Sequence, residues 1–322
     1  MKLHIPNSAF LGNIDCFIRN FDNSDPASLE ITANQKWIAV HPLVLVMTAA
    51  LAARVGAKNV VCREFEAKSK HYLQRMGLFE WIGAAADRGL VEHEPAGRFI
   101  PIQRIRSSSE LERFITEMIP LLHLEPPHSQ TIVYIVSELA RNVLEHAESE
   151  HGAFLSAQYY KKSNSIRIGI ADTGIGIRRA ITRSHAAADD LAAIRLALTP
   201  GITGTTTREG GTAQNAGAGL FFTKSIASVN RDFLVVYSGS GFYKLLKKAE
   251  DRKNPYLLRE DPFKDRHSAL DAVPAWPGTV VGIDITLDRT GEFDALLDAI
   301  RMTYGRAVRD RRSARYRKPR FT

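Results

Sequence analysis

The sequence feature that most restricts the fold and chemistry of this chain is a helix pattern with an acid and an amide one turn apart. In the segment 137–147 (SELARNVLEHA), Leu139 and Val143 continue an apolar face, and Glu138 and Asn142 lie on the stripe beside it. An amide oxygen is a hard ligand suited to Mg²⁺, and a carboxylate can accept a proton from water. The pattern indicates either a metal-assisted catalytic pair or a solvated polar stripe.

A second motif, ADTGIGI (171–177), follows directly after a predicted strand. Asp172 ends the strand, and Gly174 and Gly176 follow it. Glycine permits a turn with positive φ and the close approach of a flat ligand. A fixed carboxylate at the floor of such a pocket can accept a hydrogen bond from an exocyclic amine such as that of adenine. The motif indicates an adenine-binding turn or, alternatively, a plain strand-to-loop turn.

A third motif, NAGAGL (215–220), opens a predicted helix. Gly217 and Gly219 would expose backbone N–H groups to an anion at the helix N-terminus, where the helix dipole adds to the attraction. The motif indicates a phosphate site or, alternatively, a glycine-rich loop that leads into a helix.

Apolar patterning predicts alternating strands and helices over the first part of the chain, which indicates a small α/β domain there. Strands are expected near 28–32, 37–40, 59–64, 152–160, 165–171, 233–238, 242–247 and 279–287, and helices near 42–54, 67–76, 109–122, 128–147, 177–198, 217–229 and 292–304. The segments 199–216 and 248–277 are expected to be loops. The segment 94–109 is a linker or an edge strand followed by a helix cap, in which Ser109 and Glu112 have capping-box spacing.

The order of the motifs resembles the GHKL ATPase family, which includes gyrase B, heat-shock chaperone ATPases, histidine kinases and MutL. Glu138-x-x-x-Asn142 looks like the N box, Asp172-Thr-Gly174-Ile-Gly176 the G1 box, Gly217-Ala-Gly219-Leu220 the G2 box, and Gly278-Thr279 a short Gly-Thr element on a late strand. The resemblance covers roughly residues 109–290.

The resemblance implies an α/β sandwich in which a mixed sheet is covered by helices and ATP binds with Mg²⁺. Asn142 would bind the Mg²⁺ that bridges the phosphates, and Glu138 would be the general base. Asp172 would bind the adenine amine, with Thr279 supporting it through water. The Gly/Thr-rich segment 199–216 would be the ATP lid.

The N-terminal part is similar to STAS-like domains, and the segment 36–54 (KWIAVHPLVLVMTAALAAR) carries this similarity. STAS partners in bacterial regulation are often switched by GHKL serine kinases. The expected organisation is a STAS-like α/β domain over 1–105, a GHKL ATP-binding domain over 106–304 and a basic tail over 305–322.

The net charge of +8 sits at the C-terminal end of the chain. Residues 301–322 hold nine basic side chains and one acidic side chain, so residues 1–300 are neutral. Such a segment, with aromatic residues interleaved, can bind nucleic acid phosphates. A solvated terminus or a contact with an acidic protein are the alternatives.

Cysteine usage and hydropathy favour a cytoplasmic protein. The two cysteines, Cys16 and Cys62, are far apart and form no CxxC pair, which favours a reducing compartment without a metal cluster. The longest uncharged run, Trp37–Ala53, is too short for a membrane span and contains a proline, so a buried strand and helix are expected. The start of the chain has no pattern of a secretory signal.

Two functions remain open at this stage. The first is a Mg²⁺-dependent ATPase or protein kinase that resembles anti-sigma kinases and acts on a regulatory protein partner. The second is a nucleotide-gated binding or dimerisation module with little catalysis. Histidine autophosphorylation is disfavoured because neither His123 nor His128 lies in an acidic H box. Ser69 and the serines at 107–109 can accept phosphate chemically, but the sequence does not select any of them.

Overall fold

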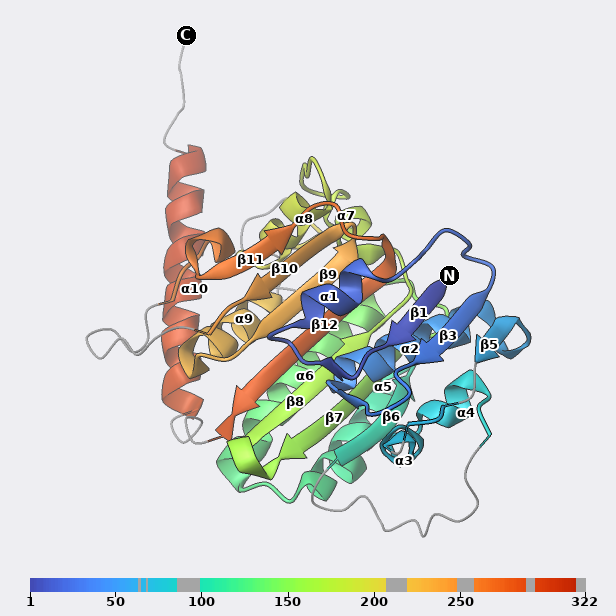
Figure 1. Cartoon of the computed structure of the whole chain (residues 1–322). Coiled ribbons are helices and arrows are strands. Elements are labelled where there is room, and N and C mark those ends of the chain that lie inside the picture. The colour runs from blue at the N-terminus through green and yellow to red at the C-terminus, as the bar shows by residue number, and fades with distance from the viewer. Residues whose placement is uncertain are drawn as a thin grey trace.

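The computed structural model describes residues 1–62, 65–67, 69–85, 99–206, 219–247, 258–287 and 293–316. Within these ranges the chain has a mixed α/β structure, as the sequence patterning predicts. A seven-stranded sheet lies at its centre; helices cover one face of this sheet, and an N-terminal layer covers the other (Figure 1).

The central sheet has the spatial order β11-β10-β9-β12-β8-β7-β6. All of its neighbouring strands pair antiparallel, so the expectation of a mixed sheet is wrong for it; short turns join β7 to β8 and β9 to β10, and strands joined in this way pair antiparallel. Its strands are β6 (Phe99–Ile105), β7 (Ala153–Tyr160), β8 (Ser165–Ala171), β9 (Leu234–Gly239), β10 (Gly241–Leu245), β11 (His267–Leu270) and β12 (Trp276–Thr286). Asn164, at φ 39°, adopts the left-handed backbone that the turn between β7 and β8 needs. The long strand β12 lies between β8 and β9, so it connects the two halves of the sheet.

The two edge strands of the central sheet lie in segments 94–109 and 248–277, for which the sequence predicts a linker or edge strand and a loop, respectively. Of the two interpretations of segment 94–109, the edge strand is the one observed for 99–105, because β6 pairs with β7. Residues 99–105 were expected to belong to the STAS-like domain over 1–105, but they are part of the central sheet. The prediction of a loop over 248–277 is wrong for 267–270, which form β11, and for 276–277, which begin β12. Strand β11 is short and half-buried, so it lacks a clear apolar alternation.

Six helices share one apolar core on a single face of the central sheet. They are α5 (Ser108–Arg113), α6 (Pro126–His146), α7 (Gly176–Ile181), α8 (Asp190–Ala197), α9 (Gly219–Asn230) and α10 (Phe293–Tyr316). Helix α6 begins two residues before its predicted start, because prolines are accommodated in a first turn, where N–H groups need no intrahelical partner.

Three helix predictions are wrong in part. The single helix over 177–198 is two helices, because Asp189 caps a new N-terminus by accepting the N–H of Ala192 at 2.7 Å. The capping residue of α5 is Ser107, which accepts the N–H of Glu110 at 3.2 Å. The chain then continues through a π turn and a 3₁₀ turn to Leu122. Helix α10 extends past its predicted end at 304 to Tyr316, so residues 305–316 are helical.

The N-terminal layer has its own parallel sheet, in the order β1-β3-β5. Its elements are β1 (Lys2–Ile5), β2 (Ser8–Ala9), α1 (Ile14–Arg19), β3 (Leu29–Ala33), β4 (Ala39–Val40), α2 (Pro42–Val55), β5 (Val60–Cys62), α3 (Lys70–Arg75) and α4 (Leu78–Ile82). A second apolar core joins this layer to the other face of the central sheet.

Helix α2 lies in the middle of that second core. It contacts β7, β8 and β12 of the central sheet and also β3 of the small sheet. Because both of its sides are covered, nearly all of its residues are buried, which explains why Arg54 is its one charged residue. Across the described ranges, no helix has both the length and the apolar character needed to cross a membrane.

Candidate functional site

A cavity of about 650 Å³ opens on the face of the central sheet that carries α6 and α9. Seven of the nine predicted site residues line it: Glu138, Asn142, Asp172, Gly176, Gly219, Leu220 and Thr279. They come from α6, the end of β8, the start of α7, the start of α9 and β12. Gly174 lies next to the cavity in the turn after Asp172, and Gly217 lies outside the described residues.

Asp172 is fixed at the buried end of this cavity, where its side chain is 1% exposed. Its Oδ1 accepts the N–H of Gly174 at 2.8 Å, and its own N–H donates to the carbonyl of Thr279 at 2.9 Å. The indole N–H of Trp276 donates to the Asp172 carbonyl at 2.9 Å. Burial raises the pKa of the Asp172 carboxyl to about 7. The side chain is therefore an oriented hydrogen-bonding group whose charge changes near neutral pH.

The turn after Asp172 packs against the C-terminal end of α6. A Cβ atom at Gly174 would lie 2.0 Å from the carbonyl oxygen of Ala147, so this position requires glycine. The N–H of Ile175 donates to the same carbonyl at 2.8 Å. This contact holds the Asp172 turn and the Glu138–Asn142 helix in one frame.

Glu138 and Asn142 lie side by side on the cavity wall, as the helix pattern predicts. Burial raises the pKa of Glu138; Arg141 opposes this rise, and Glu145 adds to it. The amide Nδ2 of Asn142 is buried and has no hydrogen-bond partner among the described residues. Buried amides normally have partners, so an unsatisfied one at a cavity wall is a sign of a ligand.

The first residue of α9 packs directly on this acid–amide pair. A Cβ atom at Gly219 would lie 2.5 Å from Oε2 of Glu138 and 3.4 Å from Nδ2 of Asn142. Glycine at this position therefore lets the N-terminus of α9, the positive end of its dipole, approach the two side chains.

Several lining residues lie outside the predicted motifs or were given no ligand role. Arg141 lies on α6 between Glu138 and Asn142, and no carboxylate in the described ranges lies within ion-pair distance of it. Arg183 is paired with Glu148 at the other rim. His146 also lines the cavity. A basic residue next to Asn142 is the one sequence signal for Arg141, and it is weak because exposed arginines are common on helices.

An aromatic column supports the cavity wall from behind. Tyr134 of α6 lines the cavity, its ring centroid is 6.0 Å from that of Phe222 in α9, and Phe222 is 6.2 Å from Tyr304 in α10. The column links the C-terminal helix to the helices that carry Glu138 and Gly219.

The predicted lid and the candidate phosphate acceptors have different positions. Thr203 and Thr205 line the cavity, and residues 207–216 of the predicted lid lie outside the described residues. Ser69 is buried, and its Oγ accepts the N–H of Ile38 at 2.6 Å. Ser107 caps α5. Neither hydroxyl lies on the cavity wall.

The donor atoms at Asn142 are suited to magnesium rather than to a soft metal. Among the described residues, no three His, Cys, Asp or Glu side chains cluster closely enough to hold a metal ion. An amide oxygen, a neighbouring carboxylate and water are hard ligands, and Mg²⁺ usually combines a few such ligands with substrate phosphates. Oδ1 of Asn142 would supply such a ligand, and its unpaired Nδ2 group, a donor, would suit a phosphate oxygen in the same site.

Comparison of the sequence with protein-family models and with curated proteins gives no match.

Proposed function

We propose that this protein is an ATP-binding regulatory enzyme of the GHKL type, which hydrolyses ATP or transfers its γ-phosphoryl group to a protein. One observation carries the proposal: side chains from three separate motifs and a late strand line one cavity of about 650 Å³. Local sequence patterns do not require distant motifs to meet, so their convergence supports a shared ligand.

The buried end of the cavity suits the adenine ring. Asp172 is held by the N–H of Gly174 and can accept a hydrogen bond from the exocyclic amine. Apolar side chains of Leu139, Ile170 and Val281 line the same cavity and would cover a flat ring. A ligand that donates to Asp172 favours the ionised carboxylate and would lower its raised pKa.

The open end suits the phosphates. Asn142 would hold Mg²⁺, which on binding neutralises charge on the phosphate oxygens. The N-terminus of α9 faces the same space, and Arg141 offers a guanidinium there. Glu138 is half-buried with a raised pKa, and a carboxylate in such a setting can accept a proton from a water molecule or a hydroxyl group.

The arrangement of the layers agrees with this proposal. A sheet with α6 and α9 on one face corresponds to the helix-covered sandwich of the GHKL type. The β1-β3-β5 sheet with α2 would be the STAS-like part. We infer a cytoplasmic regulatory role in which the N-terminal layer and a protein partner influence the ATP site.

Calorimetric titration with ATP and Mg²⁺ tests the nucleotide site. Asp172→Ala should weaken binding by about tenfold or more, because the loss of one buried charged hydrogen bond costs about 1.5–3 kcal/mol. Asp271→Ala removes an exposed acid away from the cavity and should bind as the wild type does. Equal affinity of the wild type and Asp172→Ala for ATP would refute the proposal.

Labelled ATP distinguishes the catalytic outcomes. Label from the γ-phosphate that appears as free phosphate indicates hydrolysis, and label on a protein indicates transfer. Label that stays on ATP during a single turnover would favour a nucleotide-gated module. The contact of Gly219 with Oε2 of Glu138 favours this second candidate, because α9 then restricts access to the carboxylate and a helix movement would have to precede chemistry.

A further inference from the structure

The C-terminal helix α10 has two different faces. Its inner face is apolar and half-buried to buried, and consists of Leu296, Leu297, Ile300, Tyr304, Ala307 and Val308. Its outer face is exposed and carries Arg301, Met302, Arg306, Arg309 and Arg312. Both sets follow helical spacing, so one surface packs on the protein and the opposite surface is cationic.

The inner face fixes α10 on the body of the protein. The helix contacts α9 and α6, and the edge-to-face pair of Tyr304 with Phe222 lies in that contact. Nearer the C-terminus, Arg311 lines a depression together with Arg195 of α8 and Phe263. Figure 1 shows α10 standing along the side of the molecule next to α9. The outer arginines are therefore held on a rigid element rather than on a solvated tail.

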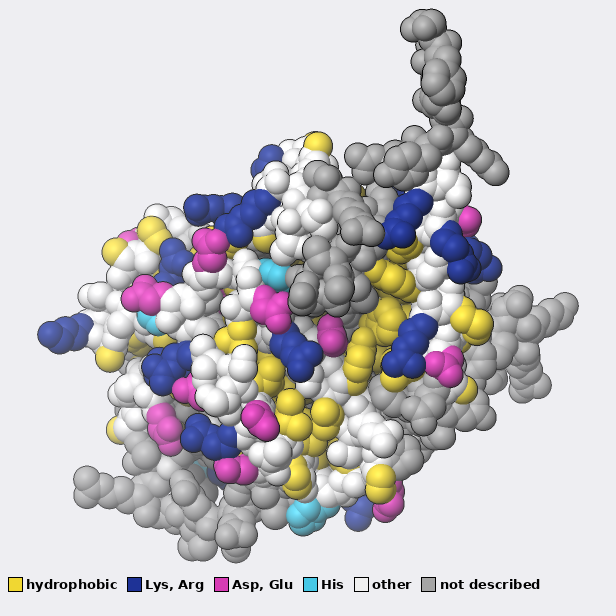
Figure 2. Space-filling view, turned by 180° about the vertical axis from the view of Figure 1, so that it is seen from behind, with side chains coloured by type: hydrophobic (Ala, Val, Ile, Leu, Met, Phe, Trp, Pro, Cys, Tyr) yellow, Lys and Arg dark blue, Asp and Glu magenta, His cyan; other side chains and the backbone are white. Residues whose placement is uncertain are grey.

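The outer face has the charge of a phosphate-binding surface. Among the side chains of α10 that the structure describes, two acids lie on the same surface: Asp298, which pairs with Arg301 at 3.1 Å, and Asp310. Lys and Arg side chains recur along this helix at the right of Figure 2. Arg301 and Arg312 are separated by roughly 16 Å along the helix axis, at about 1.5 Å per residue. Residues 1–300 are neutral, so no general positive field explains this surface.

The chemistry of this face favours duplex DNA. Single-stranded nucleic acids bind through aromatic platforms, and the described outer residues of α10 include no aromatic side chain. Membrane-surface helices insert an apolar face, but the apolar face of α10 is already packed on the protein. B-DNA has one phosphate charge per about 1.7 Å of axis, so several phosphates lie within the length of the arginine face.

We propose that the outer face of α10, formed by Arg301, Arg306, Arg309 and Arg312, binds the phosphate backbone of duplex DNA without reading its sequence. This inference does not depend on the proposed ATP site, because none of these residues lines the cavity.

The test uses the full chain without nucleotide and a fluorescent DNA duplex of about two helical turns. Anisotropy titrations from about 50 to 200 mM salt give the affinity and its salt dependence, whose slope is about −0.9 per phosphate neutralised. The variant Arg301→Gln/Arg309→Gln/Arg312→Gln should bind at least about tenfold more weakly, with a slope smaller by about 2–3. The control Lys36→Gln/Lys161→Gln/Lys162→Gln removes three exposed charges elsewhere and should match the wild type.

Several results would overturn the proposal. These are no binding by the wild type, equal binding by the arginine variant, or tighter binding to single-stranded DNA, duplex RNA, polyglutamate or anionic vesicles than to the duplex. Truncation after Tyr316 leaves α10 whole and should keep most of the affinity for DNA. Complete loss of DNA binding in this truncated protein would also contradict the assignment of binding to α10. The three arginines are exposed, so thermal unfolding of the variant should match that of the wild type.

Discussion

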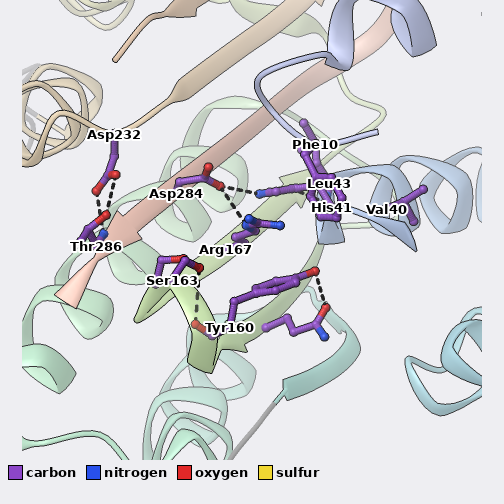
Figure 3. A network of polar contacts seen from close by, with 12 residues as sticks. Phe10, Val40, His41, Leu43, Tyr160, Ser163, Arg167, Asp232, Asp284 and Thr286 are labelled. Carbon is purple, nitrogen blue, oxygen red and sulfur yellow. Dashed lines mark hydrogen bonds and ion pairs between the residues drawn. The ribbon is translucent and has the colours of Figure 1, made fainter. Parts of the chain in front are cut away.

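Nε2 of His41 lies 3.2 Å from Oδ1 of Asp284, and this contact joins the start of α2 to the C-terminal part of β12. Nδ1 of His41 accepts the N–H of Leu43 at 3.0 Å, so Nε2 carries the proton that is donated to Asp284. Nε of Arg167 is 3.8 Å from the same carboxylate oxygen (Figure 3). Strand β12 also carries Thr279, so the N-terminal layer and the candidate cavity share one strand.

Replacing His41 should destabilise the protein strongly. His41→Ala leaves Asp284 without its buried donor and Leu43 without its cap, and we expect a loss of about 2–4 kcal/mol in the free energy of unfolding. Urea unfolding measures this loss. His4→Ala is the control, because His4 is exposed, and it should cost less than about 0.5 kcal/mol. Similar losses in both variants would mean that the His41–Asp284 contact does not stabilise the layers.

The same contact predicts a dependence of stability on pH. Burial lowers the pKa of His41 below its usual value of 6.5. The unfolded chain then binds a proton more readily than the folded protein, so His41 contributes stability that is lost as the pH falls below about 6.5. His41→Gln cannot titrate and should lose less stability than the wild type between about pH 7 and pH 5. Parallel pH profiles for the two proteins would contradict a buried neutral His41.

Asp172 should have the opposite dependence on pH. Its pKa is raised from 3.8 to about 7, so the folded protein retains a proton that the unfolded chain releases between these values. The free energy of unfolding attributable to Asp172 therefore falls as the pH rises through this window and stays low above it. At about pH 8, Asp172→Asn should be more stable than the wild type by about 2–4 kcal/mol, and near pH 4 the difference should vanish.

The two readouts on Asp172→Asn separate a binding role from a structural one. Asparagine keeps an acceptor oxygen but cannot carry charge, so we expect weaker ATP binding together with higher stability at alkaline pH. Calorimetric titration and thermal unfolding of the same preparation measure both. A variant that is less stable than the wild type at every pH would indicate that the charged Asp172 stabilises the fold, contrary to this prediction.

Local patterns in the sequence predict the candidate site well, because each motif is contained in one segment. Glu138 and Asn142 share a helix face, and Asp172 follows an alternating strand; both features depend on spacing alone. The meeting of these side chains with Thr279 depends on the pairing of β8 with β12, more than 100 residues apart. Spacing within a motif contains no information on such pairing, which only the family resemblance implies. Arg141 is not predicted because it occupies a variable position of the Glu138-x-x-x-Asn142 motif.

The ends of helices and strands are harder to predict from the sequence. At such an end, a run of charged residues can indicate a solvated segment while tertiary contacts continue the helix or strand. The run of arginines after Gly305 resembles a solvated tail, yet Ala307 and Val308 continue the apolar spacing and arginine is a good helix former, so α10 persists to Tyr316. Strand β1 of the N-terminal layer was not predicted, because no helix or turn signal precedes it to mark its start. It is stabilised by pairing with β3. Non-local pairing of this kind is not encoded in a four-residue segment.

Glu138→Gln tests the catalytic assignment. The amide keeps the size of the side chain but accepts no proton, so ATP binding should stay within about threefold and turnover should fall by about 100-fold or more. Glu150→Gln is a control, because Glu150 is an exposed acid outside the cavity lining. It should keep turnover within about threefold of the wild type. Steady-state phosphate release measures both, and equal activity of the two variants would remove Glu138 from the role of base.

Gly219→Ala tests the contact between α9 and the acid–amide pair. The added methyl group would lie 2.5 Å from Oε2 of Glu138, and because this atom ends a flexible side chain, the carboxylate should move while the fold persists. Alanine favours a helix over glycine by about 0.5–1 kcal/mol, so thermal stability should be equal or higher, whereas turnover should fall by about tenfold or more. Gly305→Ala in α10 has no heavy atom within 4 Å of its new methyl group and should gain stability without losing turnover. If Gly219→Ala turned over ATP at the wild-type rate, the position of Glu138 against α9 would have no part in catalysis.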